Sequence, residues 1–172
     1  MKLNALKFLL ITLLFFLTGV SAYFFYLGYK SHKGNPPGLH NARLSPCPDK
    51  PNCICTEYPD DSSHFTDALQ YDETQYDEKN ADAIVQSIRA AIKETGGQLL
   101  NADNINRNST YISAIYVSSL FKFVDDFEIR IAPESKRIHI RSASRVGHSD
   151  MGTNLKRITT FKKSLAGFLV SE

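Results

Sequence analysis

The residues best suited to chemistry lie between Phe121 and Arg157, a stretch rich in carboxylates, arginines and serines. Asp125 and Asp126 stand side by side, and a pair of carboxylates is the catalytic equipment of a glycosidase. Adjacent residues of a strand point to opposite faces, so these two cannot serve one site unless a bulge intervenes. Asp125 falls on the apolar side of its strand, where a carboxylate must be paired, hydrogen-bonded or protonated. Asp125 is therefore either a catalytic carboxylate or part of a buried structural network that anchors the loop of residues 147–154 to the sheet.

Two arginines suggest a second kind of chemistry, the binding of an anion. Arg141 and Arg145 are four residues apart, so on one extended strand their side chains would share a side. Together with backbone amides near Gly147 and the start of the last helix, they could hold a phosphate or a carboxylate. They could instead form salt bridges with Asp126 and with the acidic segment upstream, and so have only a structural role. The first interpretation predicts these ligand-binding residues: Arg141, Ser144, Arg145, Gly147 and Asn154.

An enzyme of this kind would take its acid and base from the same stretch. The candidate catalytic residues are Asp125, His148 and Asp150, with either aspartate as general base, His148 assisting and Arg145 binding an oxyanion. The serines lack a nucleophile elbow, and the chain contains no phosphate loop and no dinucleotide fingerprint. The three candidates would bind a metal only if a loop of unknown course brought them together, so no metal or other cofactor is predicted. The reaction class would be that of a small hydrolase or lyase.

The chain of 172 residues begins with a segment suited to a membrane. Two lysines precede an uncharged run of 22 residues from Phe8 to Tyr29, and a helix of that length spans roughly 33 Å, enough for the bilayer core. The rival interpretation is a signal peptide with Val20-Ser21-Ala22 as its processing site. Because apolar residues continue past that site, we expect a retained anchor over residues 1–30. Residues 31–44, where Gly and Pro recur, are predicted to be a linker.

Three cysteines open the remaining residues 45–172, which are predicted to form one domain. Cys47 and Cys53 enclose five residues, a short loop that a disulfide could close in an oxidising compartment. Zinc would need a further ligand and no His lies nearby, while no basic residue flanks Cys55 to make it a reactive thiol. A structural disulfide is therefore predicted. It favours a single-pass protein of the bacterial inner membrane whose domain lies outside the cytoplasm.

The apolar pattern of this domain predicts an α+β fold, an antiparallel sheet of about four to five strands with two helices packed on one face. The other face would be partly open or covered by the cysteine segment. Extended segments are expected at 64–71, 98–101, 110–118, 121–131 and 137–141, and helices beginning near 77–80 and near 155. Gly96 and Gly97 would stop the first helix, and Thr153 or Asn154 would cap the second. Residues 102–108 would form a turn.

A tight turn over Ala132–Ser135 would join the last two strands and keep their apolar faces together. The resulting register sets acidic residues opposite basic ones, which is favourable across an antiparallel pair. The predicted cross-strand pairs are Asp126 with Arg141, Glu128 with His139, and Asp125 with Ser142.

A net charge of +2 argues against a dedicated nucleic-acid-binding protein, because such domains are usually far more basic. The charge is unevenly spread, with nine acids and one base from Glu57 to Asp82, and eight bases and one acid from Lys136 to Lys163. The two segments could attract each other across the fold, or the basic one could bind an anionic ligand.

Short motifs are spread over the folded part, from Leu44 to about Leu169. They are Pro46-Cys47-Pro48, Pro51-Asn52-Cys53, Phe123-Val124-Asp125-Asp126, Arg141-Ser-Ala-Ser-Arg-Val-Gly147, Ser149-Asp150-Met151-Gly152, Asn154 and Arg157-Ile158. Together they resemble the bacterial and plastid family called domain of unknown function 1499 (DUF1499). The resemblance implies no agreed activity and supplies no catalytic residues. Two positions depart from the family pattern.

The first departure is His148, which stands where a Tyr or a similar residue is expected, so a His-based mechanism would not be a family mechanism. The second is Cys55, which stands where Ser is usual. The resemblance therefore implies that Cys47 and Cys53 form the pair and that Cys55 is the extra cysteine.

Two functional hypotheses of different class follow. The first is a membrane-anchored, non-enzymatic binding or assembly domain of the cell envelope, engaging an anionic group on a lipid, a polymer or an envelope protein. The second is the small hydrolase or lyase, which needs its side chains to converge at an open concavity. A purely structural origin of the motifs is a third possibility.

Overall fold

The computed structural model describes residues 2–71, 81–106 and 109–170 of the chain. In chain order its elements are α1 (Lys2–Ser31), β1 (Leu39–His40), β2 (Arg43–Leu44), β3 (Cys53–Cys55), β4 (Leu69–Gln70), α2 (Ala81–Glu94), β5 (Gln98–Asn106), β6 (Ser109–Val117), β7 (Val124–Ala132), the short 3-10 turn η2 (Pro133–Ser135), β8 (Arg137–Ser144) and α3 (Thr153–Val170).

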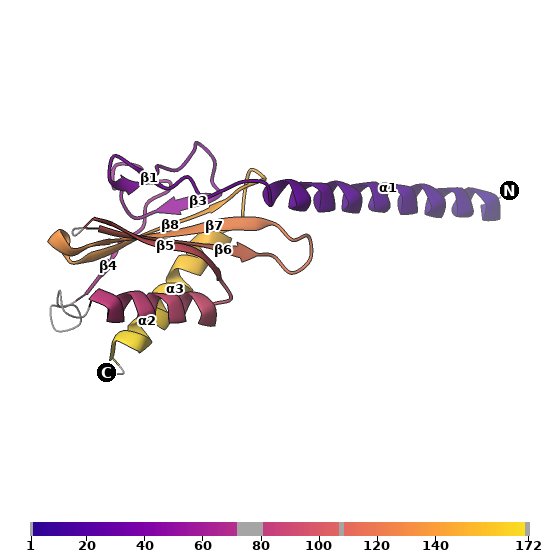
Figure 1. The fold of residues 1–172 in the computed structure, drawn as a ribbon. Coiled ribbons are helices and arrows are strands. Elements are labelled where there is room, and N and C mark those ends of the chain that lie inside the picture. Colours follow the sequence, from indigo (N-terminus) through magenta and orange to yellow (C-terminus); the bar gives the residue numbers. More distant parts are fainter. Residues whose placement is uncertain (1, 72–80, 107–108, 171–172) are drawn as a thin grey trace.

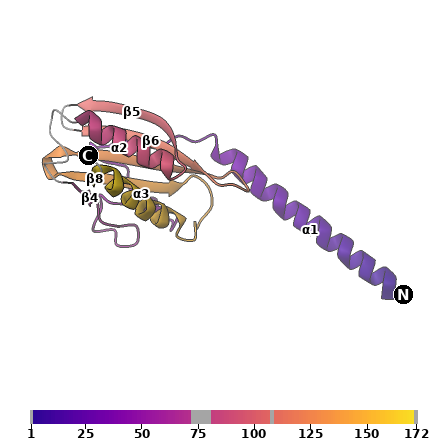
Figure 2. The same ribbon diagram turned by 90° about the horizontal axis from the view of Figure 1, so that it is seen from below.

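The main sheet is antiparallel, with the strand order β3-β8-β7-β6-β5 and with β4 also paired to β8. Helices α2 and α3 lie against one face of this sheet, and the segment that contains β1 and β2 and leads to β3 covers the other (Figure 1). Figure 2 shows the two helices side by side across the strands. The predicted α+β class, with an antiparallel sheet and two helices on one face, is confirmed. The cysteine segment forms part of the cover on the second face.

Helix α1 extends away from the domain as a long rod (Figure 1). An 18-residue stretch within Asn4–Ser31 has a mean hydropathy of 2.2, so by length and composition this helix can cross a membrane, although a signal sequence passes the same test. From residue 4 to residue 26 every side chain is exposed. Most of the helix therefore has no cover from the described part of the domain.

The core lies between the two helices and the sheet. Phe127 at its centre is fully buried, with its ring centroid 5.3 Å from that of Tyr116 on β6 and 5.0 Å from that of Phe161 on α3. Isoleucines from both helices and from three strands surround it: Ile84, Ile88, Ile92, Ile112, Ile129, Ile131, Ile138, Ile140 and Ile158. These positions follow the helical and alternating spacings that predicted the elements.

Helix α2 ends at the predicted pair of glycines. Gly96 has a φ of 86°, a conformation that a residue with a side chain rarely adopts, and Gly97 donates its N–H to the Ile92 carbonyl oxygen over 2.8 Å. A Cβ at Gly97 would lie 2.8 Å from both Ile92 and Tyr116, so this glycine is needed for space. The predicted helix start at residues 77–80 lies outside the described residues.

The β7–β8 register differs from the prediction by two residues. The observed pairs are Asp126 with Ala143, Glu128 with Arg141, Arg130 with His139, and Asp125 with Ser144. The predicted turn over Ala132–Ser135 is wrong. Lys136 also belongs to the turn, in the left-handed conformation with a φ of 54°, so the midpoint of the turn lies one residue further along the chain than predicted and every pair shifts by two residues. A shift of two residues preserves the face of every side chain, so acidic and basic residues still meet on one side of the sheet.

Two other predictions are wrong in extent. Strand β5 continues to Asn106 where a turn over 102–108 was expected, and it pairs with β6 through two irregularities of register. It is an edge strand, and such a strand tolerates polar residues that would be unfavourable at the centre of a sheet. Of the extended segment expected at 64–71, only Leu69–Gln70 forms a strand, because only this part reaches β8.

The substitution Phe127→Ala should lower the free energy of unfolding by about 3–5 kcal/mol, because it leaves a cavity between Tyr116 and Phe161. Urea denaturation of the detergent-solubilised chain, followed by circular dichroism, measures this change. Leu100→Ala is the control, since Leu100 is 49% exposed, and it should change stability by about 0.5 kcal/mol or less. Equal losses in the two variants would contradict the central position of Phe127.

Candidate functional site

Asp125 lies on the helix side of the sheet and pairs with Arg157 of α3. Arg157 Nη2 donates to Asp125 Oδ2 over 2.6 Å, and only 11% and 13% of the two side chains are exposed. The Arg157 guanidinium also lies 4.7 Å from the centroid of the Tyr116 ring, a cation–π contact. The carboxylate on the apolar face is thus satisfied by a cation from α3 and not by the serine that the predicted register placed opposite it.

Asn154, the second residue of α3, is fully buried and joins three parts of the chain. Its Nδ2 donates to the Asn52 carbonyl oxygen at 2.8 Å and to Ser144 Oγ at 3.1 Å. Its Oδ1 accepts from Ser142 Oγ at 2.6 Å and also from Arg157 Nη1. We call the side chains joined to Asn154 and Arg157 the helix-side network. It fastens the disulfide loop and α3 to the end of β8.

Asp150 caps α3. Its Oδ2 accepts from the Asn154 N–H at 2.7 Å and its Oδ1 accepts from the Gly152 N–H at 3.1 Å. The predicted caps, Thr153 and Asn154, are wrong because both already belong to the helix and the side chain of Asn154 is used inside the fold. The carboxylate of Asp150 therefore has a structural task at the helix start.

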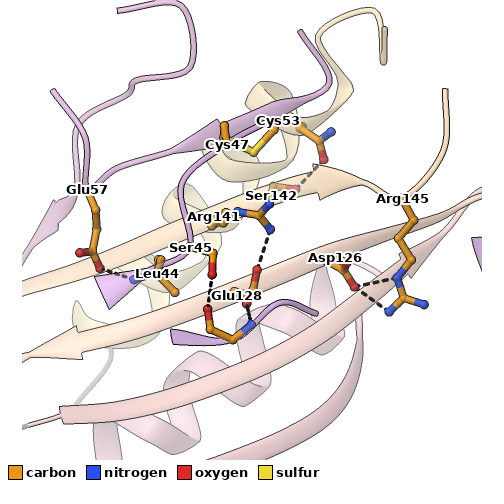
Figure 3. Close-up of polar contacts among 12 residues, drawn as sticks. Leu44, Ser45, Cys47, Cys53, Glu57, Asp126, Glu128, Arg141, Ser142 and Arg145 are labelled. Atoms are coloured by element: carbon orange, nitrogen blue, oxygen red, sulfur yellow. Dashed lines mark hydrogen bonds and ion pairs between the residues drawn. A yellow bond between two sulfur atoms is a disulfide. The ribbon is translucent and has the colours of Figure 1, made fainter. Parts of the chain in front are cut away.

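On the opposite face of the sheet two ion pairs are buried. Arg141 Nη1 donates to Glu128 Oε2 at 2.7 Å, and Arg145 Nη2 donates to Asp126 Oδ1 at 2.6 Å (Figure 3). The most exposed of these four side chains is that of Arg145, at 10%. Burial raises the pKa of Glu128, while the Arg141 cation opposes that effect. Both arginines are engaged in salt bridges, the structural alternative that the sequence left open.

The same charged groups hold the N-terminal segment. Glu128 Oε1 accepts from the Gly38 N–H at 2.9 Å and from Tyr111 Oη at 2.7 Å. Arg145 Nη1 donates to the Ser31 carbonyl oxygen at 3.1 Å. Residues 31–44, which the sequence suggested as a linker, therefore contact the sheet at both ends and contain the β1–β2 hairpin.

The disulfide joins Cys47 and Cys53, as predicted, with an S–S distance of 2.02 Å (Figure 3). Cys55 is a buried free cysteine, and burial raises the pKa of its thiol to about 11. It is therefore protonated at neutral pH and lacks the thiolate character of a reactive cysteine.

The structure does not bring the predicted site residues together. Asp125, Ser144 and Asn154 belong to the helix-side network, whereas Arg141 and Arg145 lie in ion pairs on the opposite side. Asp125 and Arg145 consequently do not face one reacting centre.

The remaining predicted residues lie in the loop before α3. Gly147 accepts a hydrogen bond from Asn52 Nδ2 at its carbonyl oxygen, at 3.0 Å, and His148 is exposed. In the described part of the chain no three His, Cys, Asp or Glu side chains gather as metal ligands.

A cleft of about 930 Å³ opens elsewhere, among the β1–β2 hairpin, residues 56–70 and the β7–β8 turn. We call it the polar cleft. The β7–β8 turn and α1 lie at opposite ends of the molecule (Figure 1), so the cleft is remote from the helix. Its charged and hydrogen-bonding wall carries three bases and four acids together with a histidine and a threonine: Arg43, Arg130, Arg137, Glu57, Asp60, Asp67, Glu134, His139 and Thr56.

A buried ion pair forms part of the cleft wall. Arg130 Nε donates to Glu57 Oε1 at 2.7 Å, with 9% and 1% of the side chains exposed. Glu57 Oε1 also accepts from the Leu44 N–H at 3.2 Å. Arg43 differs, because 62% of its side chain is exposed and its Nε is 3.9 Å from Glu57 Oε2. The inner charges are thus paired, while a cation at the edge remains accessible.

His139 lies in the same wall and is buried. Its Nδ1 is 3.2 Å from Thr56 Oγ1, which accepts from the Ile140 N–H at 2.9 Å. Burial is the largest influence and lowers the pKa of His139, with the Glu57 carboxylate opposing it and the Arg130 cation adding to it. The imidazole is therefore neutral at pH 7.

Sequence reasoning missed the cleft. Arg130 and His139 each stand between two isoleucines of an alternating strand, which puts them on its polar face, and this alternation was the available signal. Glu57 and Thr56 complete the wall from an irregular segment, and a segment without periodicity gives no indication of which strand it will cross.

Comparison with known proteins identifies the family. A family model described as a protein of unknown function (DUF1499) matches residues 43–165, well over half of the chain. The chain belongs to the DUF1499 family. This confirms the resemblance carried by the motifs.

The other comparisons add little for this DUF1499 protein. No curated protein matches it. Among solved structures, the crystal structure of the vertebrate conserved region of human METTL16 is similar over 52% of this chain and 74% of that chain. The TM-score is 0.40 and the sequence identity is 6%, so this likeness carries no argument.

The DUF1499 motifs coincide with the structural contacts just described. Asn52, Asp125, Asn154 and Arg157, from four separate motifs, meet in the helix-side network. Arg141 and Arg145, from a fifth motif, form the buried ion pairs. In this member, the residues that carry the resemblance therefore hold α3, the disulfide loop and the N-terminal segment to the sheet.

The substitution Asn154→Ala should lower the free energy of unfolding by at least about 2 kcal/mol, because it leaves buried groups of Ser142 and Asn52 without their partner. Urea denaturation measures the loss. Thr159→Ala, at an exposed position of the same helix, is the control and should stay within about 0.5 kcal/mol of the wild type. A loss no larger than that of the control would contradict the role of the network.

The pH dependence of stability should reveal His139. The folded pKa is lower than the ordinary value of 6.5, so below pH 6.5 the unfolded chain binds a proton that the folded chain does not. The contribution of His139 to stability is therefore fully present above pH 6.5 and is lost progressively as the pH falls toward the folded pKa. His139→Gln should show a smaller loss of unfolding free energy between about pH 7.5 and about pH 5.5 than the wild type.

The control for this experiment is His148→Gln, since His148 is exposed. Its urea-denaturation profile against pH should follow that of the wild type. Parallel profiles for the wild type and His139→Gln would mean that His139 is not held neutral by burial.

Proposed function

We propose that this protein is a membrane-anchored, non-enzymatic binding or assembly domain of the cell envelope, and that it engages an anionic group in the polar cleft. The anchor is α1, and the domain lies outside the cytoplasm as a single-pass protein of the bacterial inner membrane. The disulfide supports this location, because such bonds persist in oxidising compartments.

The exposure of α1 supports a retained anchor. Tyr23, Phe25 and Tyr26 follow the potential processing site, yet they are 59%, 51% and 59% exposed. A chain cleaved after Ala22 would carry these aromatic side chains into water, whereas a bilayer and its interface accommodate them.

The observation that carries the binding proposal is the arrangement of charge in the cleft. Glu57 and Arg130 neutralise each other in the wall. Arg43 and Arg137 are exposed, and among the described residues Arg137 forms no ion pair. Two accessible guanidinium groups are suited to a carboxylate or a phosphate. Asp60, Asp67 and Glu134 also line the cleft, so the anionic group of the ligand must lie beside the two arginines and away from these carboxylates.

The cleft replaces the loop before α3 as the favoured binding surface for a physical reason. An anion bound through Arg141 or Arg145 would have to displace Glu128 or Asp126, and breaking a buried ion pair is strongly unfavourable. Arg43 and Arg137 need no such exchange.

One observation favours the second candidate, a small hydrolase or lyase. His139 is neutral beside the Thr56 hydroxyl in the cleft wall, and a neutral imidazole can act as a general base. Conversion of a bound compound, rather than its simple retention, would favour this candidate.

The test is native mass spectrometry of the full chain purified from its own membranes, which looks for a retained anionic compound. The double substitution Arg43→Ala with Arg137→Ala should reduce retention at least about tenfold, because it removes two charge-assisted contacts. Displacement by added inorganic phosphate provides a second measurement with a defined probe.

Two further variants locate the site. Arg89→Ala, which removes an exposed cation from α2, should retain the compound like the wild type. Arg145→Ala should also retain it, whereas loss in Arg145→Ala with full retention in the double variant would move the site to the loop before α3.

A further inference from the structure

The loop Ser118–Phe123, between β6 and β7, lies beside the end of α1 that joins the domain (Figure 1). We propose that this loop is a second membrane contact, in which Leu120 enters the bilayer interface next to α1. The partner is the lipid surface of the leaflet on the domain side. The inference rests on the retained anchor of the proposed function and does not depend on what the polar cleft binds.

Aromatic stacking joins the loop to the helix. The ring centroid of Phe121 is 5.1 Å from that of Phe24 and 5.3 Å from that of Phe25. Phe123 adds a contact of 6.3 Å with Phe24. These distances are those of interacting aromatic pairs. The loop therefore lies at the same height along the α1 axis as Phe24 and Phe25.

Backbone contacts fix the same junction. A Cβ on Gly28 would lie 1.8 Å from the Phe121 carbonyl oxygen, so only glycine allows the helix to approach this closely. The Val124 N–H donates to Ser31 Oγ at 3.0 Å, and the His32 Nε2 lies 3.0 Å from the Lys122 carbonyl oxygen. The loop is thus held against α1 by the helix itself.

The position of the charges along α1 sets the depth of the loop. Tyr29 ends the uncharged run and Lys30 is the first charge after it. Phe24 precedes Tyr29 by five residues, which places it about 8 Å deeper along the helix axis. If α1 crosses the bilayer, the loop stacked on Phe24 and Phe25 must lie in the interface or just below it.

The side chains of the loop suit that environment. Leu120 is 64% exposed, and no residue of the described domain covers most of it. Lys122, which follows in a left-handed turn with a φ of 59°, is exposed and can extend its ammonium group to the headgroups. An exposed leucine beside a membrane helix, with a lysine close by, is the pattern expected at a lipid interface.

A two-point attachment would also orient the domain. Strand β7 starts at Val124, next to the loop, and runs nine residues to Ala132 before the turn that borders the polar cleft. Nine residues of strand span about 30 Å. The cleft would therefore be carried away from the bilayer, toward the aqueous space.

The chain contains no tryptophan, so Leu120→Trp introduces a single fluorescent reporter. The full chain is reconstituted into vesicles of phosphatidylcholine and phosphatidylglycerol. The emission of Leu120→Trp should shift to shorter wavelength relative to Ser135→Trp, which places the reporter at the exposed turn beyond β7. Lipids brominated near the headgroup should quench Leu120→Trp more than lipids brominated at the chain end, and neither should quench Ser135→Trp.

A matched pair of glycine substitutions tests the docking of the loop. Combined with Leu120→Trp, Gly28→Ala should abolish the shift and the lipid quenching, because its Cβ collides with the Phe121 carbonyl oxygen. Gly19→Ala is the control in the same helix, since nothing lies within 4 Å of a Cβ there, and it should preserve both signals. Preserved signals in Gly28→Ala would overturn the docked arrangement.

Two outcomes separate the loop from the anchor. One outcome is a vesicle-bound chain of full mass in which aqueous iodide quenches the fluorescence of Leu120→Trp as strongly as that of Ser135→Trp. This outcome would overturn the loop contact alone. A mass lacking the first 22 residues would overturn the retained anchor, and the loop contact with it.

Discussion

Burial of charge on the β7–β8 pair is the constraint on which this structure depends. Alternate residues of the two strands are acidic or basic, and both faces of the strands are covered, one by helices and the other by the N-terminal segment. An unpaired charge in such a place costs several kcal/mol, so each acid must meet a base. Among the described residues, Asp125 meets Arg157 on the helix face, and buried pairs on the other face join Glu128 with Arg141, Asp126 with Arg145, and Glu57 with Arg130. The hydrogen-bonding capacity left over on these groups binds Gly38, Leu44 and Ser31, so charge pairing also fastens the N-terminal segment to the sheet.

On the other face of the sheet, the helix-side network holds α3 and the disulfide loop to the strands. It centres on the Asn154 amide, which has donors and an acceptor for two serines, a backbone carbonyl and Arg157. The stretch from Phe121 to Arg157 therefore supplies structure on both sides of one strand pair. Most of the carboxylates, arginines and serines of this segment therefore take part in contacts that assemble the fold.

The two ends of β7 serve different surroundings. At one end lie α1 and the loop Ser118–Phe123, and at the other lie the turn and the polar cleft. A strand in the middle of a sheet is stiff, so it transmits a fixed spacing between the proposed bilayer contact and the proposed binding surface. With the proposed anchor in the bilayer, this spacing favours a partner in the aqueous space over a lipid of the same bilayer.

The sequence by itself determined the features that local pattern encodes. The length of the apolar run marked α1, the spacing of isoleucines marked the helices and the faces of the strands, and the short Cys47–Cys53 loop marked the disulfide. Only the tertiary structure decided which polar groups meet. Asp125 pairs with Arg157, 32 residues further along the chain, and Glu57 pairs with Arg130, 73 residues further along. The left-handed conformation of Lys136 shifts the β7–β8 register by two residues. The reason is physical: periodicity specifies which face of an element is buried, but pairing between distant side chains depends on the course of irregular segments, which have no periodicity.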